Sequence, residues 1–270
     1  MSVGAAIEEV ARLVAGGGVV AFTGAGISAE SGIPTFRDPG GLWERYDPSD
    51  FGTWDGVMRT AMSAPDRLAE FLSELRKVFG EARPSAAHRA LARLEGAGLV
   101  EGVVTQNVDG LHQEAGSTHV IEVHGSFARV SCLAAGHRSA VTREEFLEGL
   151  DRAILGLRTA FVPSFASILP RCPECGAPAR PDFVAFGEAV HDLEQAERLV
   201  AGCRVLLVVG TSGEVYPVAG LPHEARASGA TVVEIAKGET FVEADLRLRG
   251  EAGTVLPAIA QMVGAIGPGA

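Results

Sequence analysis

Cysteine is scarce in this 270-residue chain, basic side chains are outnumbered by acidic ones, and long apolar runs are missing. Four cysteines are too few for the disulfide framework of a small secreted protein. Lys and Arg number 23 against 34 Asp and Glu, and the resulting net charge of −11 argues against a nucleic-acid-binding surface. The apolar run at residues 205–209 is far shorter than the roughly 20 residues of a membrane-spanning helix.

No export signal is expected either, because Glu8 and Glu9 stand where a signal peptide needs a basic start and an unbroken apolar stretch. Hydrophobic residues make up 47% and charged residues 21%, which excludes intrinsic disorder. At about 150 residues per domain, the length predicts two domains or one large domain with an insertion. We therefore expect a soluble cytoplasmic protein that binds neither nucleic acid nor membranes.

Short apolar runs alternate with helical patterns along most of the chain. The runs lie at residues 19–22, 99–105, 204–209 and 231–235, and each is typical of a parallel strand covered on both faces. Helical patterns lie at residues 5–15, 84–94, 193–201, 217–227 and 256–263. This alternation predicts an α/β protein with a Rossmann-like, doubly wound parallel sheet.

Two stretches interrupt this rhythm. Residues 34–83 hold a loop rich in Pro, Gly and aromatic residues and then a helical segment near 66–79, and residues 126–180 hold a second helical segment near 143–155. We expect residues 1–35, 84–125 and 181–270 to form the large domain, and residues 36–83 and 126–180 to form a smaller inserted domain.

A nucleotide-binding motif follows the first predicted strand. Gly24-x-Gly26-x-x-Ala29 matches the dinucleotide fingerprint, in which one glycine makes a tight turn, the next lets the backbone approach a pyrophosphate, and amides at a helix start face the anion. The alternative is a tight strand-to-helix turn without a ligand. The acidic residue usual about 20 positions further on is missing, so an ordinary hydride-transfer unit is not expected.

Further polar residues follow the predicted strands, where ligands of open α/β sheets bind. Gln106, Asn107 and Asp109 follow one strand, His124 ends the next apolar run, and residues 210–212 follow another. A loop at residues 28–37 can cover a bound ligand and exclude water.

Taken together, the segments GAGISAESGIPTFR, TQNVDGLH, HG, CPEC, FGE and GTS, in this order, resemble the sirtuin family of NAD-dependent protein deacylases. The resemblance extends from about residue 5 to about residue 262. It implies a large Rossmann-type domain and a small domain with zinc-ribbon and helical parts, with NAD and an acyl-lysine protein meeting in the cleft between them.

The resemblance implies a role for each motif. The residues implied to bind NAD are Gly24, Ala25, Gly26, Ser28, Phe36, Arg37, Gln106, Asn107, Asp109, Gly210, Thr211, Ser212 and Ala236. Phe36 and Arg37 would lie on the mobile cofactor loop. His124 would be the general base, and with Asn107 and Asp109, which border the nicotinamide pocket, it forms the implied catalytic set.

The mechanism implied by the family begins with loss of nicotinamide, after which the acyl oxygen attacks the exposed ribose carbon. His124 then activates a ribose hydroxyl, which gives O-acyl-ADP-ribose and free lysine. Imidazole suits this task because its unperturbed pKa of about 6.5 is close to the operating pH. Without the other motifs, a lone histidine before a glycine, such as His124, is more often a structural residue. Asn107 and Asp109 can likewise be turn residues.

The implied zinc site departs from the family pattern of two Cys-x-x-Cys pairs. Cys172 and Cys175 form an intact pair, but Cys132 is followed by Ala135 where the fourth thiolate belongs. His137, two residues further on, can complete a Cys₃His set. Alternatively, the site is weakened, filled by water or empty, and the cysteines are small apolar residues.

Two other departures concern ligands. Ala236 replaces an asparagine that helps to hold the adenosine ribose in the family. Leu72 and Leu75 stand where some relatives carry the Tyr and Arg that bind acidic acyl groups, so an acetyl or a longer apolar acyl group is expected. The residues implied to bind the substrate peptide are Val184, Phe186, Gly187, Glu188 and Val215.

Two other functions remain open at this point. One is mono-ADP-ribosyl transfer or NAD hydrolysis, and the other is an NAD-responsive binding protein without catalysis. Retention of His124, Asn107 and Asp109 argues against the binding protein, because a protein that only binds NAD needs no base at the ribose.

Overall fold

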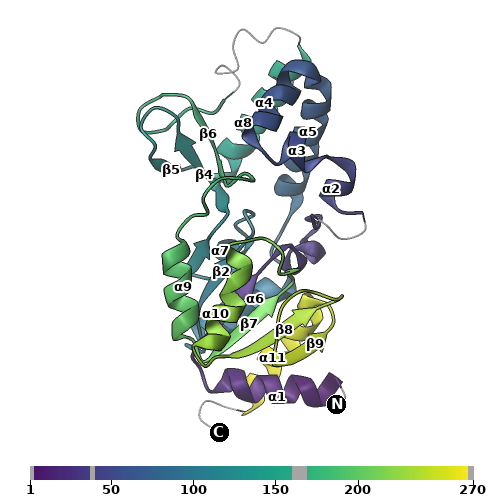
Figure 1. Cartoon of the computed structure of the whole chain (residues 1–270), viewed down its shortest axis with the longest axis vertical. Helices are drawn as coiled ribbons and strands as arrows, with labels where there is room; N and C mark the ends of the chain where they lie inside the picture. Colours follow the sequence, from purple (N-terminus) through teal and green to yellow (C-terminus); the bar gives the residue numbers. More distant parts are fainter. Residues whose placement is uncertain (1–2, 37–39, 160–168, 267–270) are drawn as a thin grey trace.

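The computed structural model describes residues 3–36, 40–159 and 169–266, and it has two parts stacked along the long axis (Figure 1). The lower part is built on a parallel sheet, and the upper part combines helices with a small antiparallel sheet. Within the described ranges, none of the helices has both the length and the apolar character that crossing a bilayer requires.

Six parallel strands form the sheet of the lower part. They are β1 (Val19–Thr23), β2 (Val100–Thr105), β3 (Val120–Glu122), β7 (Val205–Val209), β8 (Thr231–Ala236) and β9 (Leu246–Arg249). Their order, β3-β2-β1-β7-β8-β9, is that of a doubly wound Rossmann sheet, which confirms the predicted fold class. Because the order reverses next to β1, a ligand crevice is expected at the carboxyl ends of β1 and β7.

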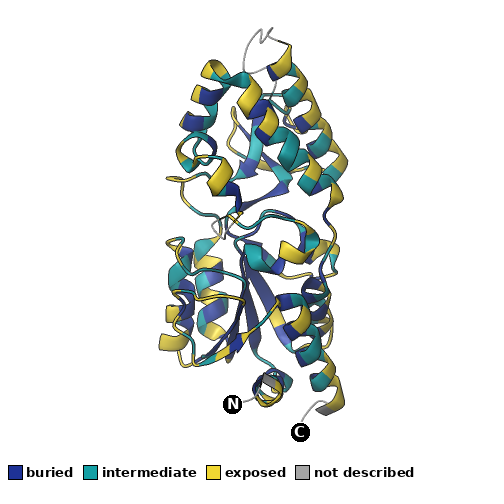
Figure 2. Ribbon diagram, turned by 90° about the vertical axis from the view of Figure 1, so that its right-hand side faces the viewer, coloured by how far each residue is buried: buried dark blue, intermediate teal, exposed yellow. Residues whose placement is uncertain are grey.

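Helices cover both faces of this sheet, so its strands are buried (Figure 2). On one face lie α1 (Val3–Ala15), α6 (Ala86–Gly96) and α11 (Ala252–Ile266); on the other lie α9 (Leu193–Gly202) and α10 (Leu221–Ala227). The short helix α7 (Leu111–Glu114) follows β2. The five helices on the two faces correspond to the five helical patterns of the sequence that alternate with strands.

The upper part contains α2 (Leu42–Arg45), α3 (Pro48–Phe51), α4 (Trp54–Ser63), α5 (Pro65–Glu81) and α8 (Arg143–Arg158). Its antiparallel sheet has the order β5-β4-β6 and comprises β4 (Gly125–Cys132), β5 (Arg138–Ala140) and β6 (Ala179–Phe183). Helices α5 and α8 pack together over an apolar cluster that contains Phe79, Phe146 and Leu150. The residue numbers at which the two predicted domains begin and end stay a prediction.

The predicted helix start after Gly24 is wrong. Two 3₁₀ turns, η1 (Ala25–Ile27) and η2 (Ala29–Ser31), follow β1 instead, and a third, η4 (Val218–Gly220), precedes α10. Gly32 ends the segment in the left-handed region, at φ 84°, so too few residues remain for an α-helix. Strand β9 and helices α2 to α4 were not predicted.

Candidate active site

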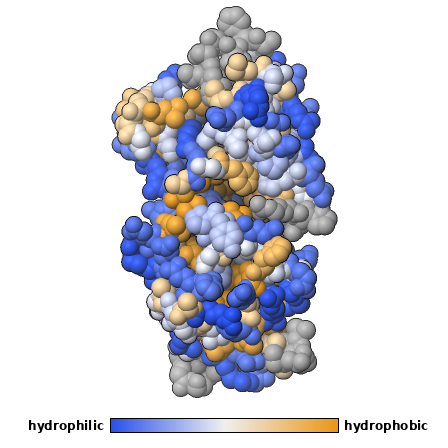
Figure 3. Space-filling model, viewed as in Figure 1, coloured by the Kyte–Doolittle hydropathy of each residue, from blue (hydrophilic) through white to orange (hydrophobic). Residues whose placement is uncertain are grey.

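A cavity of about 800 Å³ extends from the carboxyl ends of the parallel strands into the upper part. Figure 3 shows apolar side chains gathered in the hollow where the two parts meet. The predicted NAD-binding residues that line it are Gly24, Ala25, Gly26, Phe36, Gln106, Asn107, Asp109, Gly210, Thr211 and Ser212. His124 and the predicted peptide-binding residues Val184, Phe186, Gly187, Glu188 and Val215 line it as well. Ser28 and Ala236 do not, and Arg37 lies outside the described residues.

The glycine loop packs backbone to backbone against the end of β7. The N–H of Gly26 donates to the carbonyl of Gly210 at 2.8 Å. A Cβ on Gly26 would lie 2.7 Å from the Gly210 Cα, and Gly210 itself has a φ of +62°, so both positions require glycine. This contact joins the two strand ends on either side of the expected crevice.

Three cavity-lining residues keep backbone donors free. The N–H groups of Ala25, Thr211 and Ser212 have no partner among the described residues, whereas those of Gly24 and Gly26 are paired with Val209 and Gly210. Unpaired amides on two adjacent loops form a site suited to an anion such as a pyrophosphate. These amides, rather than amides at the predicted helix start, are the candidate hydrogen-bond donors to the pyrophosphate.

Ser28, Asn107 and Asp109 form a buried hydrogen-bonded group beneath the loop. The Ser28 hydroxyl donates to Asp109 Oδ2 at 2.7 Å. Asn107 Nδ2 donates to Ser28 Oγ and to the Gly24 carbonyl, both at 3.1 Å. Both amide hydrogens of Asn107 are thus used, which leaves its Oδ1 to accept a hydrogen bond from a ligand. Burial raises the pKa of Asp109, although hydrogen bonds from Leu111 and Ser28 oppose this.

Two histidines to which the sequence analysis gave no functional role support this group from below. His88 Nδ1 accepts from the N–H of Ser85 at 3.1 Å, so the proton is on Nε2, which lies 3.5 Å from Ser28 Oγ. His112 Nε2 lies 2.9 Å from Thr23 Oγ1, and the two rings are 4.7 Å apart. Burial lowers the pKa of His88 to about 4 and that of His112 well below its usual value, so both are neutral.

His124 follows β3 and presents one free nitrogen. Its Nδ1 lies 3.0 Å from the Gln106 carbonyl, which can only accept, so Nδ1 carries the proton and Nε2 keeps its lone pair. Nε2 has no hydrogen-bond partner among the described residues, and the residue lines the cavity. Burial lowers the pKa of His124, which keeps the ring neutral at physiological pH. The ring can therefore act as a base.

The predicted peptide-binding segment is held by contacts across the molecule. The N–H of Val184 donates to the His124 carbonyl at 3.0 Å, which fixes the segment beside the base. The Glu188 carboxylate accepts from Trp54, Arg180 and the backbone of Ala185, so protein donors already occupy it. Glu188 thus orders the wall of the cavity.

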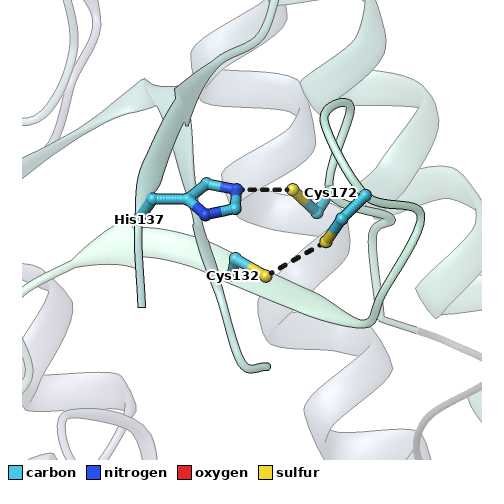
Figure 4. A group of neighbouring side chains, drawn as sticks. Cys132, His137 and Cys172 are labelled. Carbon is cyan, nitrogen blue, oxygen red and sulfur yellow. Dashed lines mark hydrogen bonds between the residues drawn. The ribbon is translucent and has the colours of Figure 1, made fainter. Parts of the chain in front are cut away.

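Cys132, His137, Cys172 and Cys175 come together at the end of β4 and the two adjacent turns (Figure 4). Cys132 and Cys175 have sulfurs 3.5 Å apart, and His137 Nε2 lies 3.0 Å from Cys172 Sγ. All four ligand atoms lie within 4.8 Å of one another. Zn–S bonds of about 2.3 Å in a tetrahedron require sulfurs about 3.8 Å apart, so the set fits a structural zinc ion.

The sequence profile of the Sir2 family matches residues 24–217, which contain the glycine loop, the buried polar group, His124 and the four potential zinc ligands. The chain belongs to the Sir2 family.

Proteins similar to this Sir2-family chain include an NAD-dependent protein deacylase from Desulfosudis oleivorans, which is 42% identical over 266 residues covering 97% of each chain. A solved complex of a Sir2 homologue with NAD has a TM-score of 0.77 at 34% identity and covers 96% of this chain and 94% of its own. Sir2Af2 bound to a myristoylated histone peptide has a TM-score of 0.72 at 31% identity and covers 97% and 98%.

Proposed function

We propose that this Sir2-family chain is an NAD-dependent protein deacylase that removes acyl groups, acetyl among them, from lysine side chains of proteins. The products would be nicotinamide, O-acyl-ADP-ribose and free lysine. The observation that carries this proposal is the unpartnered Nε2 of a neutral His124, in a cavity that the glycine loop and the segment around Val184 both line.

The residues present suit NAD as co-substrate. NAD would supply a ribose carbon that becomes electrophilic as nicotinamide leaves, and a ribose hydroxyl that receives the acyl group. The free amides of Ala25, Thr211 and Ser212 would bind the pyrophosphate. Asn107 Oδ1 would accept a hydrogen bond from the nicotinamide amide, and Asp109 would border the same pocket. His124 Nε2 would take the proton of the ribose hydroxyl.

We also propose that Cys132, Cys172, Cys175 and His137 hold a structural zinc ion. His137 would replace the thiolate for which Ala135 offers no ligand atom. A thiolate site needs reduced cysteines, and all four cysteines are free, so the cytoplasm is the proposed compartment.

Mass analysis of the products tests the function. The chain is incubated with NAD and an acetyl-lysine peptide, and with NAD alone. We expect acetyl-ADP-ribose that requires the peptide, and its loss in His124→Ala with much of the NAD binding kept. Free ADP-ribose without peptide, or an ADP-ribosylated protein, would instead indicate NAD hydrolysis or mono-ADP-ribosyl transfer. No turnover at all would indicate an NAD-responsive binding protein.

A succinyl peptide of the same sequence extends this test to the acyl group. Leu72 and Leu75 pack into the apolar clusters of the upper part and line the cavity, so a buried carboxylate would find no partner there. We expect a lower kcat/KM for the succinyl than for the acetyl peptide, and the reverse order would contradict the proposed roles of both leucines.

A further inference from the structure

The chain crosses from the upper to the lower part in the stretch between β6 and α9 (Figure 1). We call residues 184–190 of this stretch the peptide loop, because it contains four of the predicted peptide-binding residues. At its start, the N–H of Val184 donates to the His124 carbonyl at 3.0 Å, and just after its end the N–H of His191 donates to the Val123 carbonyl at 2.9 Å. The two ends of the loop therefore rest on successive carbonyls of the segment that carries the candidate base.

The side chain of His191 ties the end of the peptide loop to its start. His191 Nε2 lies 3.3 Å from Oδ1 of Asp182, which stands in β6 two residues before the loop. The side chains of His191 and Asp182 are 24% and 1% exposed, so water screens their attraction less than that of a surface pair. Whether the ring is charged or neutral, Nε2 can carry a hydrogen toward the carboxylate, and this contact keeps the two ends of the loop together.

Asp182 is a fixed anchor for this contact. The Ser131 hydroxyl donates to its Oδ1 at 2.5 Å, and Arg129 Nε donates to its Oδ2 at 3.1 Å. The backbone of Asp182 also packs against Gly125, which follows His124 and has a φ of +86°, and a Cβ on Gly125 would lie 1.6 Å from the Asp182 carbonyl oxygen. His191 thus contacts a residue that is held against the backbone of the base.

The junction after His191 has one defined geometry. Asp192, the residue before α9, has a φ of 50° in the left-handed region, which a residue with a side chain keeps only where its surroundings hold it. Arg138 of β5 lies 3.6 Å from the Asp192 carboxylate and 4.0 Å from that of Asp182. The chain that leaves the peptide loop is therefore held from both sides of His191.

We propose that His191 is a positioning residue for deacylation: it ties the peptide loop to Asp182 and so holds the acyl-lysine peptide beside His124. This rests on the proposed function and assigns a role at the same site to a histidine to which the sequence analysis gave none. When the contact is lost, the peptide must order the loop as it binds, and the entropy cost weakens its binding. NAD binding is unchanged, because the candidate pyrophosphate donors lie on other loops.

Kinetics of His191→Ala and His191→Gln with an acetyl-lysine peptide test the role. His191→Ala keeps the backbone hydrogen bond to Val123 but loses the side-chain contact, so we expect the KM for the peptide to rise about three- to tenfold while the KM for NAD stays the same. His191→Gln, whose amide can still donate to Asp182, should recover most of the loss. An unchanged KM for the peptide in His191→Ala, or an equal rise in both KM values, would overturn the proposal.

His223→Ala is the matched control, because it removes an exposed histidine from α10 and should change neither KM. Melting temperatures show whether each variant is folded. His191→Leu, which keeps much of the volume of the ring but has no donor, takes the place of His191→Ala in case the alanine variant does not fold. Recovery by leucine to the level of glutamine would assign the effect to packing and overturn the role of the contact with Asp182.

Two measurements without NAD separate this inference from the proposed function. Equilibrium binding of the acetyl-lysine peptide should be weaker in His191→Ala than in the wild type and restored in His191→Gln, even if no turnover occurs. In the free protein, amide hydrogen exchange over residues 184–190 should be faster in His191→Ala, because the loop opens more often. Equal peptide affinity, or equal exchange, in the wild type and His191→Ala would overturn the proposal even if acetyl-lysine is turned over.

Discussion

At the level of single residues, hydrogen bonds within the protein decide which atoms remain for a ligand. The Gln106 carbonyl accepts a hydrogen bond from the Nδ1–H of His124, and the Gly24 carbonyl and Ser28 Oγ accept from the two amide hydrogens of Asn107. Each side chain is thereby fixed in one tautomer or one amide orientation before a ligand arrives. The free lone pairs belong to His124 Nε2 and Asn107 Oδ1, and both residues line the cavity.

The lowered pKa of His124 predicts the acid limb of the pH profile. The neutral ring is the proposed base, and burial lowers its pKa below the ordinary value of 6.5, so the active form persists below pH 6.5 and activity is lost as the pH falls through the lowered pKa. We expect the acid limb of kcat/KM to have its midpoint below 6.5. A midpoint above 6.5 would mean that burial does not control the pKa of His124.

His88 is predicted to hold Ser28 in place, and Ser28 in turn orients the cavity-lining Asn107 for NAD binding. His88→Ala leaves the buried Ser28 hydroxyl and Ser85 amide short of a partner, which costs about 1–3 kcal/mol. We expect the KM for NAD to rise roughly tenfold while the KM for the peptide stays unchanged. His88→Gln, whose amide can still donate toward Ser28, should recover part of the loss. A lower melting temperature with an unaltered KM for NAD would instead indicate a purely structural role.

At the level of elements, one buried ion cluster ties the two sheets together. Arg129 of β4 pairs with Glu122 of β3 at 3.0 Å and with Asp182 of β6 at 3.1 Å. Both carboxylates are almost fully buried, with side chains 5% and 1% exposed. Burial raises the pKa of Glu122, and the charge of Arg129 opposes this.

Arg129→Ala is therefore predicted to destabilise the whole chain. It leaves the buried Glu122 carboxylate without its cation, while Asp182 keeps its contacts to Arg138 and His191. Breaking a buried pair in this way typically costs about 3–5 kcal/mol of unfolding free energy. Urea unfolding measures this loss. Arg59→Ala, which removes an exposed pair with Asp50, is the control and should change the free energy by about 1 kcal/mol or less. Similar effects of the two substitutions would mean that the cluster contributes little.

The turn between β4 and β5 is predicted to depend on His137 as a metal ligand. Metal analysis should find close to one zinc per chain in the wild type and in His137→Cys. Removing an outer-shell partner costs about 10–100-fold in metal affinity, so His137→Ala, which loses a direct ligand, should lose zinc to a chelator even more readily. The exposed His223→Ala is the control. Full zinc retention in His137→Ala would exclude His137 from the site.

Continuous apolar runs made most of the large sheet predictable, since β1, β2, β7 and β8 are buried on both faces. Strand β9 was not predicted from the sequence because it lies at the sheet edge and alternates Leu with Arg. Helices α2 and α3 have four residues each, too few for helical periodicity. Most of the residues that the motifs predicted to bind NAD or the peptide line the cavity. The contact between Ser28 Oγ and His88 Nε2 joins residues 60 positions apart, and only the packing of the folded chain brings them together, so the sequence did not predict it.

At the level of the whole molecule, the cavity lies where the two parts meet, so both substrates must approach a chain that carries a net charge of −11. A negative molecule attracts a basic peptide during diffusional encounter and repels an acidic one. This field acts on the rate of association, whereas the contacts inside the cavity act after binding.

Salt dependence is therefore predicted to differ with the charge of the peptide. Between about 0.01 and 1 M salt the Debye length shrinks from about 30 to about 3 Å, which removes the long-range attraction. With NAD saturating, kcat/KM for an acetyl peptide rich in Lys and Arg should fall severalfold over this range, while kcat stays constant because a saturated enzyme no longer depends on encounter. For an acidic peptide with the same acetyl-lysine, kcat/KM should rise or stay constant over the same range of salt. A parallel fall for both peptides would assign the salt effect to the enzyme itself, and steering by net charge would be wrong.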